Sequence, residues 1–358
     1  MARAYNLSAG PATLPLEVLE EAQQELLDYK GTGMSIMEHS HRGKAYMAVH
    51  AEAIANTKEL LGIGDDYAVL FLQGGASLQF SMIPMNLLGE GQTADYTNSG
   101  AWAAKAIKEA KLIGKVNVAA DCGKEIPTRV PLASEMNLTD GAAYVHITSN
   151  ETISGAQWKS FPKTEAPLVC DMSSDILSRP FNTKDFGLIY AGAQKNLAPA
   201  GMALVIMRKD LAERVSGSVP TMLKYSTHIE NDSMFNTCPC FTIYMYMLVT
   251  RWIKKTGLET LYARNVDKAA KLYRAIDSTD FYKGTAVPAC RSDMNVTWRL
   301  PSEELEAAFV KEAAEAGFSG LKGHRSVGGI RASIYNAFPV EGVDALVSFM
   351  KDFEARNG

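Results

Sequence analysis

The sequence predicts an α/β fold with a mostly parallel central sheet, helices on both faces of that sheet and a smaller C-terminal α/β domain. Between about residue 67 and residue 207, short apolar runs typical of buried strands alternate with segments whose apolar residues recur at helical spacing. This alternation is typical of parallel sheets covered by helices. Small or polar residues follow directly after several runs, at the sheet edge where α/β proteins bind their ligands.

The elements can be placed in order from periodicity and from turn residues. Breakers at residues 8–11 predict an extended start, and Pro15 suits the first turn of a helix. Ser302 has the character of a helix cap. We expect helices at residues 15–30, 45–61, 78–88, 241–255, 258–277 and 302–316, and strands at residues 67–72, 94–98, 142–148, 166–171, 187–190, 202–207, 294–299 and 330–335.

The composition is that of a folded protein with a large core. The 358 residues are 47% hydrophobic and 21% charged, which predicts an N-terminal segment (1–14), a large domain (15–257) and a small domain (258–358). No apolar leader or membrane-length apolar stretch occurs, so we expect a cytoplasmic protein. The net charge of -4 without a basic stripe argues against nucleic acid, and five scattered cysteines argue for a reducing compartment and against a metal site.

A carboxylate and a lysine stand at the ends of two neighbouring apolar runs. Residues 166–171 end on Asp171, and the run at residues 187–190 precedes a small-residue turn that carries Lys195. Taken alone, a turn lysine is more often a solvated loop residue. Burial beside the sheet edge would lower its pKa and provide a free amine for an aldehyde. A lysine for the aldehyde and an acid for the pyridinium nitrogen are the pair that pyridoxal phosphate requires.

A glycine turn adds the third part of this interpretation. Residues 67–72 lead into Gln-Gly-Gly-Ala-Ser at residues 73–77, directly before a helical segment. Free backbone N–H groups at such a helix start hold phosphate. The turn matches neither a Walker loop nor a dinucleotide fingerprint, so it does not indicate ATP or NAD. Such turns are common, and this one gains meaning only beside Asp171 and Lys195.

Two glycine-bounded loops are rich in cationic donors. For each loop, a solvated connection is the alternative to a binding role. An arginine fork grips carboxylate or phosphate with two parallel hydrogen bonds, and imidazoles add donors. We therefore predict two anion clamps. They are residues 31–44, with His41 and Arg42, and residues 321–331, with His324, Arg325 and Arg331.

Two further residues lie where they would meet a cofactor ring. Trp102 follows a strand and turn at the start of a helix, where its ring would stack on pyridine, although packing is the commoner role. Thr152 follows the strand at residues 142–148 and offers a hydroxyl. His146, within that strand, is interpreted as a core histidine.

With these residues assembled, the chain resembles the phosphoserine aminotransferases, a family of fold-type I enzymes that use pyridoxal 5'-phosphate. The resemblance extends over nearly the whole chain. It is carried by the motifs SAGPA at residues 8–12, MEHSHRGK at 37–44, IYAGAQKN at 189–196, SMFNT at 233–237, KGHR at 322–325 and IYNA at 334–337.

The resemblance implies a role for each candidate residue and a homodimer that shares its active sites. Lys195 would bind the cofactor aldehyde and Asp171 the ring nitrogen. Trp102 would stack on the ring, and Thr152 would contact its hydroxyl. The neighbours of the cofactor phosphate would be Ala76, Ser77 and Gln194. Asn236 and Thr237 would reach into the neighbouring subunit's site and join them there. Substrate anions would be held by His41, Arg42, His324, Arg325 and Arg331.

The implied reaction belongs to serine biosynthesis. It transfers the amino group of L-glutamate to 3-phosphohydroxypyruvate and gives O-phospho-L-serine and 2-oxoglutarate. The related reaction of 4-phosphohydroxythreonine in pyridoxine biosynthesis stays open. Some relatives carry Gly-Arg where this chain has Ala76-Ser77, and Ala9 replaces a serine, so substrate preference is in question.

Three rival interpretations remain at this point. An alanine-glyoxylate or serine-pyruvate aminotransferase would have little use for so many cationic donors. A cysteine desulfurase would need a suitably placed loop cysteine. A non-catalytic protein that binds phosphorylated metabolites would use the glycine turn and the arginines, but it would leave the pair of Asp171 and Lys195 without a role.

Overall fold

The computed structural model describes residues 3–122, 128–214 and 218–358, and its largest element is a seven-stranded sheet. The strand order is β2-β10-β9-β8-β5-β3-β4. The strands are β2 (Tyr67–Leu72), β10 (Ala203–Arg208), β9 (Leu188–Gly192), β8 (Leu168–Asp171), β5 (Val145–Thr148), β3 (Thr93–Asn98) and β4 (Lys115–Asp121). Only β10 runs antiparallel to its neighbours β2 and β9 among these strands, so the sheet is mostly parallel, as predicted.

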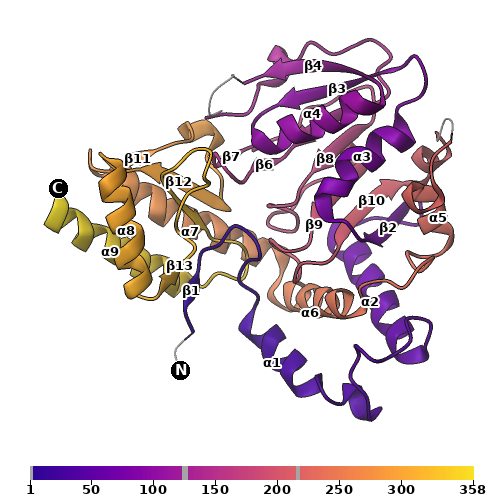
Figure 1. Ribbon diagram of the computed structural model, residues 1–358, viewed down its shortest axis with the longest axis horizontal. Helices are drawn as coiled ribbons and strands as arrows, with labels where there is room; N and C mark the ends of the chain where they lie inside the picture. Colours follow the sequence, from indigo (N-terminus) through magenta and orange to yellow (C-terminus); the bar gives the residue numbers. More distant parts are fainter. Residues whose placement is uncertain (1–2, 123–127, 215–217) are drawn as a thin grey trace.

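Helices cover the large sheet on both faces. On one side lie α1 (Leu16–Glu25), α2 (Lys44–Leu61) and α6 (Cys240–Thr256), and on the other α3 (Gly75–Leu87), α4 (Ala101–Ile113) and the short α5 (Tyr225–Glu230) (Figure 1). Alternation along each strand explains the two layers, because successive side chains point to opposite faces. In β10, Leu204 and Ile206 join the core of α2 and α6, whereas Val205 and Met207 join the core of α3 and α4.

The C-terminal part of the chain has a core of its own. A three-stranded sheet of β11 (Lys283–Gly284), β12 (Asn295–Arg299) and β14 (Ile330–Ser333) packs with α7 (Leu258–Asp277), α8 (Glu303–Glu315) and α9 (Val340–Asn357). The Ser302 side chain caps α8 by accepting from Leu305 N at 3.3 Å, as predicted. The division at residue 257 stays a prediction, and residues 1–2 of the expected N-terminal segment lie outside the described ranges.

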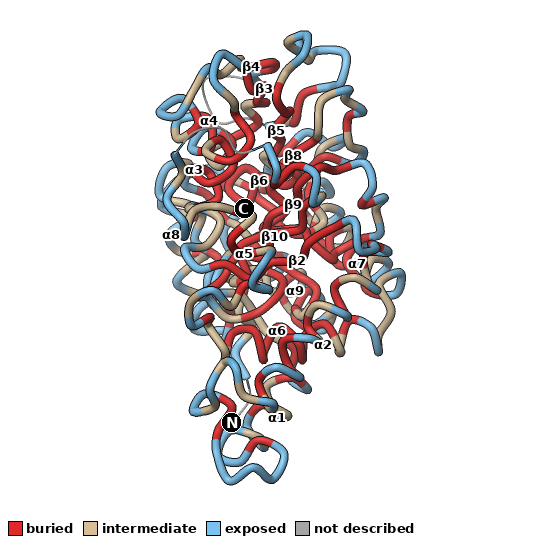
Figure 2. Tube along the Cα trace, turned by 90° about the vertical axis from the view of Figure 1, so that its right-hand side faces the viewer, coloured by how far each residue is buried: buried red, intermediate tan, exposed pale blue. Residues whose placement is uncertain are grey.

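Two small strand pairs complete the described structure. β6 (Asn150–Glu151) and β7 (Ala156–Gln157) form a hairpin directly after β5. β1 (Tyr5–Asn6) pairs in parallel with β13 (Phe318–Ser319), so the start of the chain is attached to its C-terminal part. Figure 2 shows the strands of the large sheet as the buried centre of the molecule.

Several elements differ from the expectations. The first helix ends at Glu25, and the turn at residues 29–31 is a separate 3-10 helix, so a single helix over residues 15–30 was wrong. The third helix begins at Gly75, inside the glycine turn, rather than at residue 78. β4 and α9 were not predicted. No helix in the described ranges is long and apolar enough to cross a membrane.

Candidate active site

Asp171 and Lys195 meet at the carboxyl edge of adjacent parallel strands. Asp171 is the last residue of β8, and it pairs in register with Tyr190 of β9. β9 ends at Gly192, and Lys195 lies in the turn that follows. The Lys195 Nζ donates to Thr152 Oγ1 at 2.7 Å. The structure therefore brings together the acid, the lysine and the hydroxyl that the sequence singled out.

Burial determines the ionisation of both charged groups. It lowers the pKa of Lys195 from 10.5 to about 8, although the negative charges of Asp171 and Glu151 act in the opposite direction. Burial also raises the pKa of Asp171, and the nearby Lys195 ammonium opposes that rise. At pH 7, roughly one tenth of Lys195 is therefore a free amine, far more than for a solvated lysine.

Asp171 is held by a short chain of hydrogen bonds. Its Oδ1 accepts from Ser173 N at 2.8 Å, and its carboxylate is also hydrogen-bonded by Tyr190. The Tyr190 hydroxyl lies 2.9 Å from His146 Nε2. Burial lowers the pKa of His146 to about 3, so its imidazole is neutral, and its Nδ1 has no partner among the described residues. His146 is a core histidine, as expected.

The N-terminus of α3 fits a phosphate group. Gly74 precedes the helix with φ of 89°, and no side chain caps the helix there. A Cβ at Gly74 would lie 2.6 Å from Leu78 Cδ2, so both the backbone angle and the space favour glycine. The first N–H groups of α3, which include those of Ala76 and Ser77, have no carbonyl partner within the helix. They form a donor cluster at the same sheet edge as Lys195.

The indole of Trp102 lies close to the lysine. Trp102 occupies the first turn of α4, and its ring centroid is 5.2 Å from Lys195 Nζ. Its Nε1 is buried without a partner in the described structure. The Lys105 Nζ, from the next turn of α4, lies 4.1 Å from the same centroid. The arrangement leaves a ring and an unused donor facing the region that a pyridine cofactor would need.

Cationic side chains from three elements gather beside this group. Arg331 of β14 donates from Nη1 to Thr152 O at 3.4 Å, and its buried Nε has no partner in the part of the chain described. Burial lowers the pKa of His324, and so do the charges of Arg331, Lys105 and Arg325. The neighbouring positive charges thus disfavour the protonated form of His324, and a bound anion would offset them. The sequence had not singled out Lys105, because a helical lysine is usually solvated.

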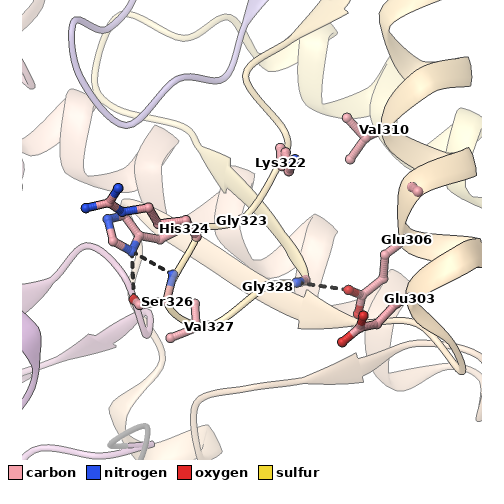
Figure 3. A pocket seen from close by; sticks show the side chains of 12 residues that line it. Glu303, Glu306, Val310, Lys322, Gly323, His324, Ser326, Val327 and Gly328 are labelled. Carbon is pink, nitrogen blue, oxygen red and sulfur yellow. Dashed lines mark hydrogen bonds between the residues drawn. The ribbon is translucent and has the colours of Figure 1, made fainter.

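The loop that carries His324 also borders a cavity of about 710 Å³ against α8 (Figure 3). Gly329 N donates to Glu306 Oε2 at 3.0 Å, which fixes the end of the loop. The His324 ring lies on the other side of the loop from Glu303 and Glu306, and its Nδ1 is 2.7 Å from Ser326 Oγ. Glu303 and Glu306 nevertheless line the same cavity as His324 and Arg325.

The remaining candidates are not joined to Lys195 within one chain. Among the described residues, His41 and Arg42 form no hydrogen bond or ion pair with Asp171, Lys195 or Arg331. His41 Nε2 is buried without a partner in this part of the structure, and Arg42 is exposed.

The segment with Asn236 and Thr237 lies next to the glycine turn of the same chain. Gln73 Nε2 donates to Thr237 O at 3.0 Å, and Asn236 Nδ2 donates to Gln73 Oε1 at 3.2 Å. Gln194 accepts from Ala12 N at 2.9 Å through its carbonyl, which ties the lysine turn to the N-terminal segment. In the described ranges, no group of His, Cys, Asp and Glu residues has the arrangement of a metal site.

Comparison with known proteins gives a consistent family assignment. The family model described as aminotransferase class-V matches residues 4–346. A phosphoserine aminotransferase of Desulfosudis oleivorans is 57% identical over 360 residues, with 99% of each chain covered. Among solved structures, the phosphoserine aminotransferase from Bacillus circulans subsp. alkalophilus is 58% identical with a TM-score of 0.97 and 99% of each chain covered.

A more distant solved structure agrees. The phosphoserine aminotransferase from Trichomonas vaginalis, described as PLP-bound, is 42% identical with a TM-score of 0.94, covering 98% of this chain and 100% of that one. Both structures have the fold-type I architecture predicted here. The likeness covers the whole length of the chain at high identity, and the chain therefore belongs to the phosphoserine aminotransferases of the class-V aminotransferase family.

Proposed function

We propose that this chain is a transaminase that transfers the amino group of L-glutamate to 3-phosphohydroxypyruvate and forms O-phospho-L-serine and 2-oxoglutarate, a step of serine biosynthesis. The cofactor is pyridoxal 5'-phosphate. The observation that carries the proposal is a buried lysine with a pKa of about 8, beside a buried aspartate and a group of basic side chains for which the described residues provide no salt bridge. The first two features suit amino-group chemistry, and the third suits phosphorylated substrates.

The residues present fit the cofactor. Its phosphate would be held by the N–H groups of Ala76 and Ser77 at the start of α3, its ring by Trp102, and its ring nitrogen by Asp171. When bound, the cofactor supplies an electron-accepting ring that stabilises the negative charge developing at the substrate Cα. The carboxylate of Asp171 favours a protonated ring nitrogen because it places a negative charge beside it.

Lys195 moves the proton in this proposal. As a free amine, its Nζ would take the proton from the substrate Cα and hold it as an ammonium, and in the reverse direction the ammonium would give a proton to Cα. A pKa of about 8 suits both directions, because a general base works best when its pKa lies near the working pH. Thr152 Oγ1, at 2.7 Å from Nζ, keeps the amine oriented.

The cationic group accounts for substrate choice. Arg331, half buried beside Thr152, is suited to the carboxylate next to the reacting carbon. His324, Arg325 and Lys105 lie further along the same group and are suited to the doubly charged phosphate. A substrate without the phosphate, as in alanine-glyoxylate transamination, would leave Arg325 and Lys105 without a counter-charge. Action on the 4-phosphohydroxythreonine pair rests on the same argument.

We also propose a homodimer in the cytoplasm, in which a second copy of the chain completes each site. Large apolar side chains are exposed in the segment around α1 and the start of α2, with Leu27 at 85% and Met37 at 53% exposure. Phe235, beside Asn236, is 42% exposed. Such surface is usually covered by a partner. The second copy would deliver His41 and Arg42 to the substrate, and Asn236 and Thr237 to the cofactor phosphate.

The experiment is an absorbance spectrum of the protein with pyridoxal phosphate, recorded before and after L-glutamate and then after each keto acid. We expect the band of the lysine-bound form to vanish with L-glutamate and to return with phosphorylated, not unphosphorylated, hydroxypyruvate. Equal recovery with both keto acids would refute the phosphate specificity. Absence of any cofactor band would refute the enzyme and favour a binding protein.

A further inference from the structure

Glu151 is a buried carboxylate that the proposed mechanism does not use. It ends β6, and its side chain is fully buried at 0% exposure. Burial raises its pKa to about 7, although hydrogen bonds from the backbone of Ala103 and Trp102 oppose the rise. A buried carboxylate needs hydrogen-bond partners, because burying it without partners would destabilise the protein.

Its partners are the turn and the first residues of α4. Glu151 Oε1 accepts from Ala103 N at 3.2 Å and from Ser99 Oγ at 3.3 Å, and Oε2 accepts from Trp102 N at 3.3 Å. The residue before the helix, Gly100, provides no side-chain cap. Glu151 thus caps α4 from a distant strand, with its negative charge at the positive end of the helix dipole.

The fit at this cap is close. A Cβ built on Gly100 would lie 2.5 Å from Glu151 Cδ and 2.6 Å from Oε2. Only glycine at position 100 leaves room for the carboxylate without a shift of either group. The φ of Gly100 is 164°, which any residue adopts, so the requirement comes from the carboxylate and not from the backbone.

The Glu151 carboxylate is connected to two residues that lie close to Lys195, namely Trp102 and Thr152. Through its bond to Trp102 N it holds the residue whose ring lies 5.2 Å from Lys195 Nζ. The next residue in the chain is Thr152, whose Oγ1 accepts from Lys195 Nζ and whose carbonyl accepts from Arg331. A shift of Glu151 would therefore move Trp102 and Thr152 relative to Lys195.

The Glu151 cap also makes the N-terminus of α4 a poorer site for an anion than the N-terminus of α3. α3 and α4 both begin after strands of the large sheet, and both offer free N–H groups to an anion. The start of α4 already holds the Glu151 carboxylate, whereas no side chain caps α3. A cofactor phosphate at α4 would meet a negative charge, and one at α3 would not.

We propose that Glu151 is a positioning residue of this active site, whose carboxylate fixes the start of α4, and with it the Trp102 ring, against the cofactor. This inference rests on the proposed function, because it takes pyridoxal phosphate to bind at Lys195. Glu151 touches no reacting atom. It acts through Trp102 and Thr152.

The test compares Glu151→Gln with the matched change Glu109→Gln. Glu109 lies on α4, the helix that Glu151 caps, and its carboxylate accepts from Ser81 Oγ at 3.2 Å, away from the helix start. The dissociation constant of pyridoxal phosphate is measured by titration of the apo-protein. Circular dichroism of the bound cofactor reports ring orientation. For Glu151→Gln we expect about tenfold weaker binding, a reduced dichroic band and a fall in kcat that exceeds the change in KM. The control should stay within about twofold of the unsubstituted protein.

Each outcome decides the proposal. If Glu151→Gln lowers the melting temperature but keeps cofactor affinity and dichroism unchanged, the role is structural only and the proposal is wrong. If Glu151→Gln does not fold, Ser99→Ala decides, since it removes a single hydrogen bond and should weaken cofactor binding about two- to threefold. Unchanged binding in Ser99→Ala would then overturn it. Cofactor binding needs no substrate, so a protein that binds pyridoxal phosphate but ignores L-glutamate would refute the proposed function alone.

Discussion

Replacing Asp171 by asparagine should make Lys195 more acidic. Burial alone would lower the pKa of Lys195 further, and the Asp171 charge is the first of the groups that hold it up at about 8. An opposite charge at close range is worth at least about one pKa unit, so we expect a value near 7 in Asp171→Asn. The change keeps size and shape, and asparagine still accepts from Ser173 N.

The magnitude follows from the fraction of free amine. At pH 8, Lys195 has about 150 times more free amine than a lysine of pKa 10.5. At pH 7 its free fraction should rise about fivefold in Asp171→Asn, from roughly one tenth to one half. Transamination should fall sharply at the same time, because the ring nitrogen loses its acid partner. Higher amine reactivity with lower turnover is a combination that a general loss of structure would not produce.

The assay is competitive acetylation of the apo-protein across a pH series, read by mass spectrometry on the peptide that contains Lys195. No cofactor is present, so its own ionisation does not enter. The matched control is Asp185→Asn, an exposed aspartate ahead of β9, which should leave the labelling midpoint unchanged. A midpoint in Asp171→Asn that stays near 8 or rises would refute the electrostatic coupling of the two residues.

Other substitutions test the remaining assignments. Lys195→Ala should abolish turnover and leave circular dichroism and melting temperature unchanged; normal turnover would remove the lysine from the mechanism. In steady-state kinetics, Arg325→Ala and Lys105→Ala should each lower kcat/KM for the phosphorylated keto acid about tenfold and kcat/KM for L-glutamate by less. The reason is that phosphate carries more charge than carboxylate. Equal losses for the two substrates would argue against a phosphate role. Lys268→Met should destabilise the protein by about 3 kcal/mol in urea unfolding, since Lys268 Nζ bonds to three buried backbone carbonyls. A loss below about 1 kcal/mol would contradict this. Burial lowers the folded pKa of Lys268 from 10.5 to about 7, so the unfolded chain binds more protons between these values; stability should therefore rise with pH across that window, and this rise should vanish in Lys268→Met.

The sequence predicted the parts of the site that depend on local patterns. A buried run that ends in a carboxylate fixes the position of Asp171 from neighbouring residues alone, and the same holds for the turn of Lys195. The helix at residues 258–277 has the predicted bounds, because its apolar periodicity is strong and a glycine precedes it. Ser302 was identified as a cap for the same local reason.

The rest depends on contacts between distant segments. Glu151 was not singled out from the sequence, because its partners on α4 lie about 50 positions earlier. The direction of β10 follows from its pairing with β2, which no local pattern encodes. The roles assigned to Arg42 and Asn236 need a second copy of the chain, and they stay predictions.

The attachment of the N-terminal segment has a consequence for synthesis in the cell. Tyr5 pairs with Phe318, and the carbonyl of Ala9 accepts from the Tyr335 hydroxyl across 326 positions of sequence. Gly10, in turn, lies so close to the lysine turn that a Cβ there would be 3.4 Å from Lys195 Cγ. The segment at residues 5–10 can therefore dock only after the chain has been made as far as Tyr335. A nascent chain therefore leaves Lys195 uncovered until Tyr335 has been made, so products truncated before that residue should bind chaperones rather than fold around the cofactor.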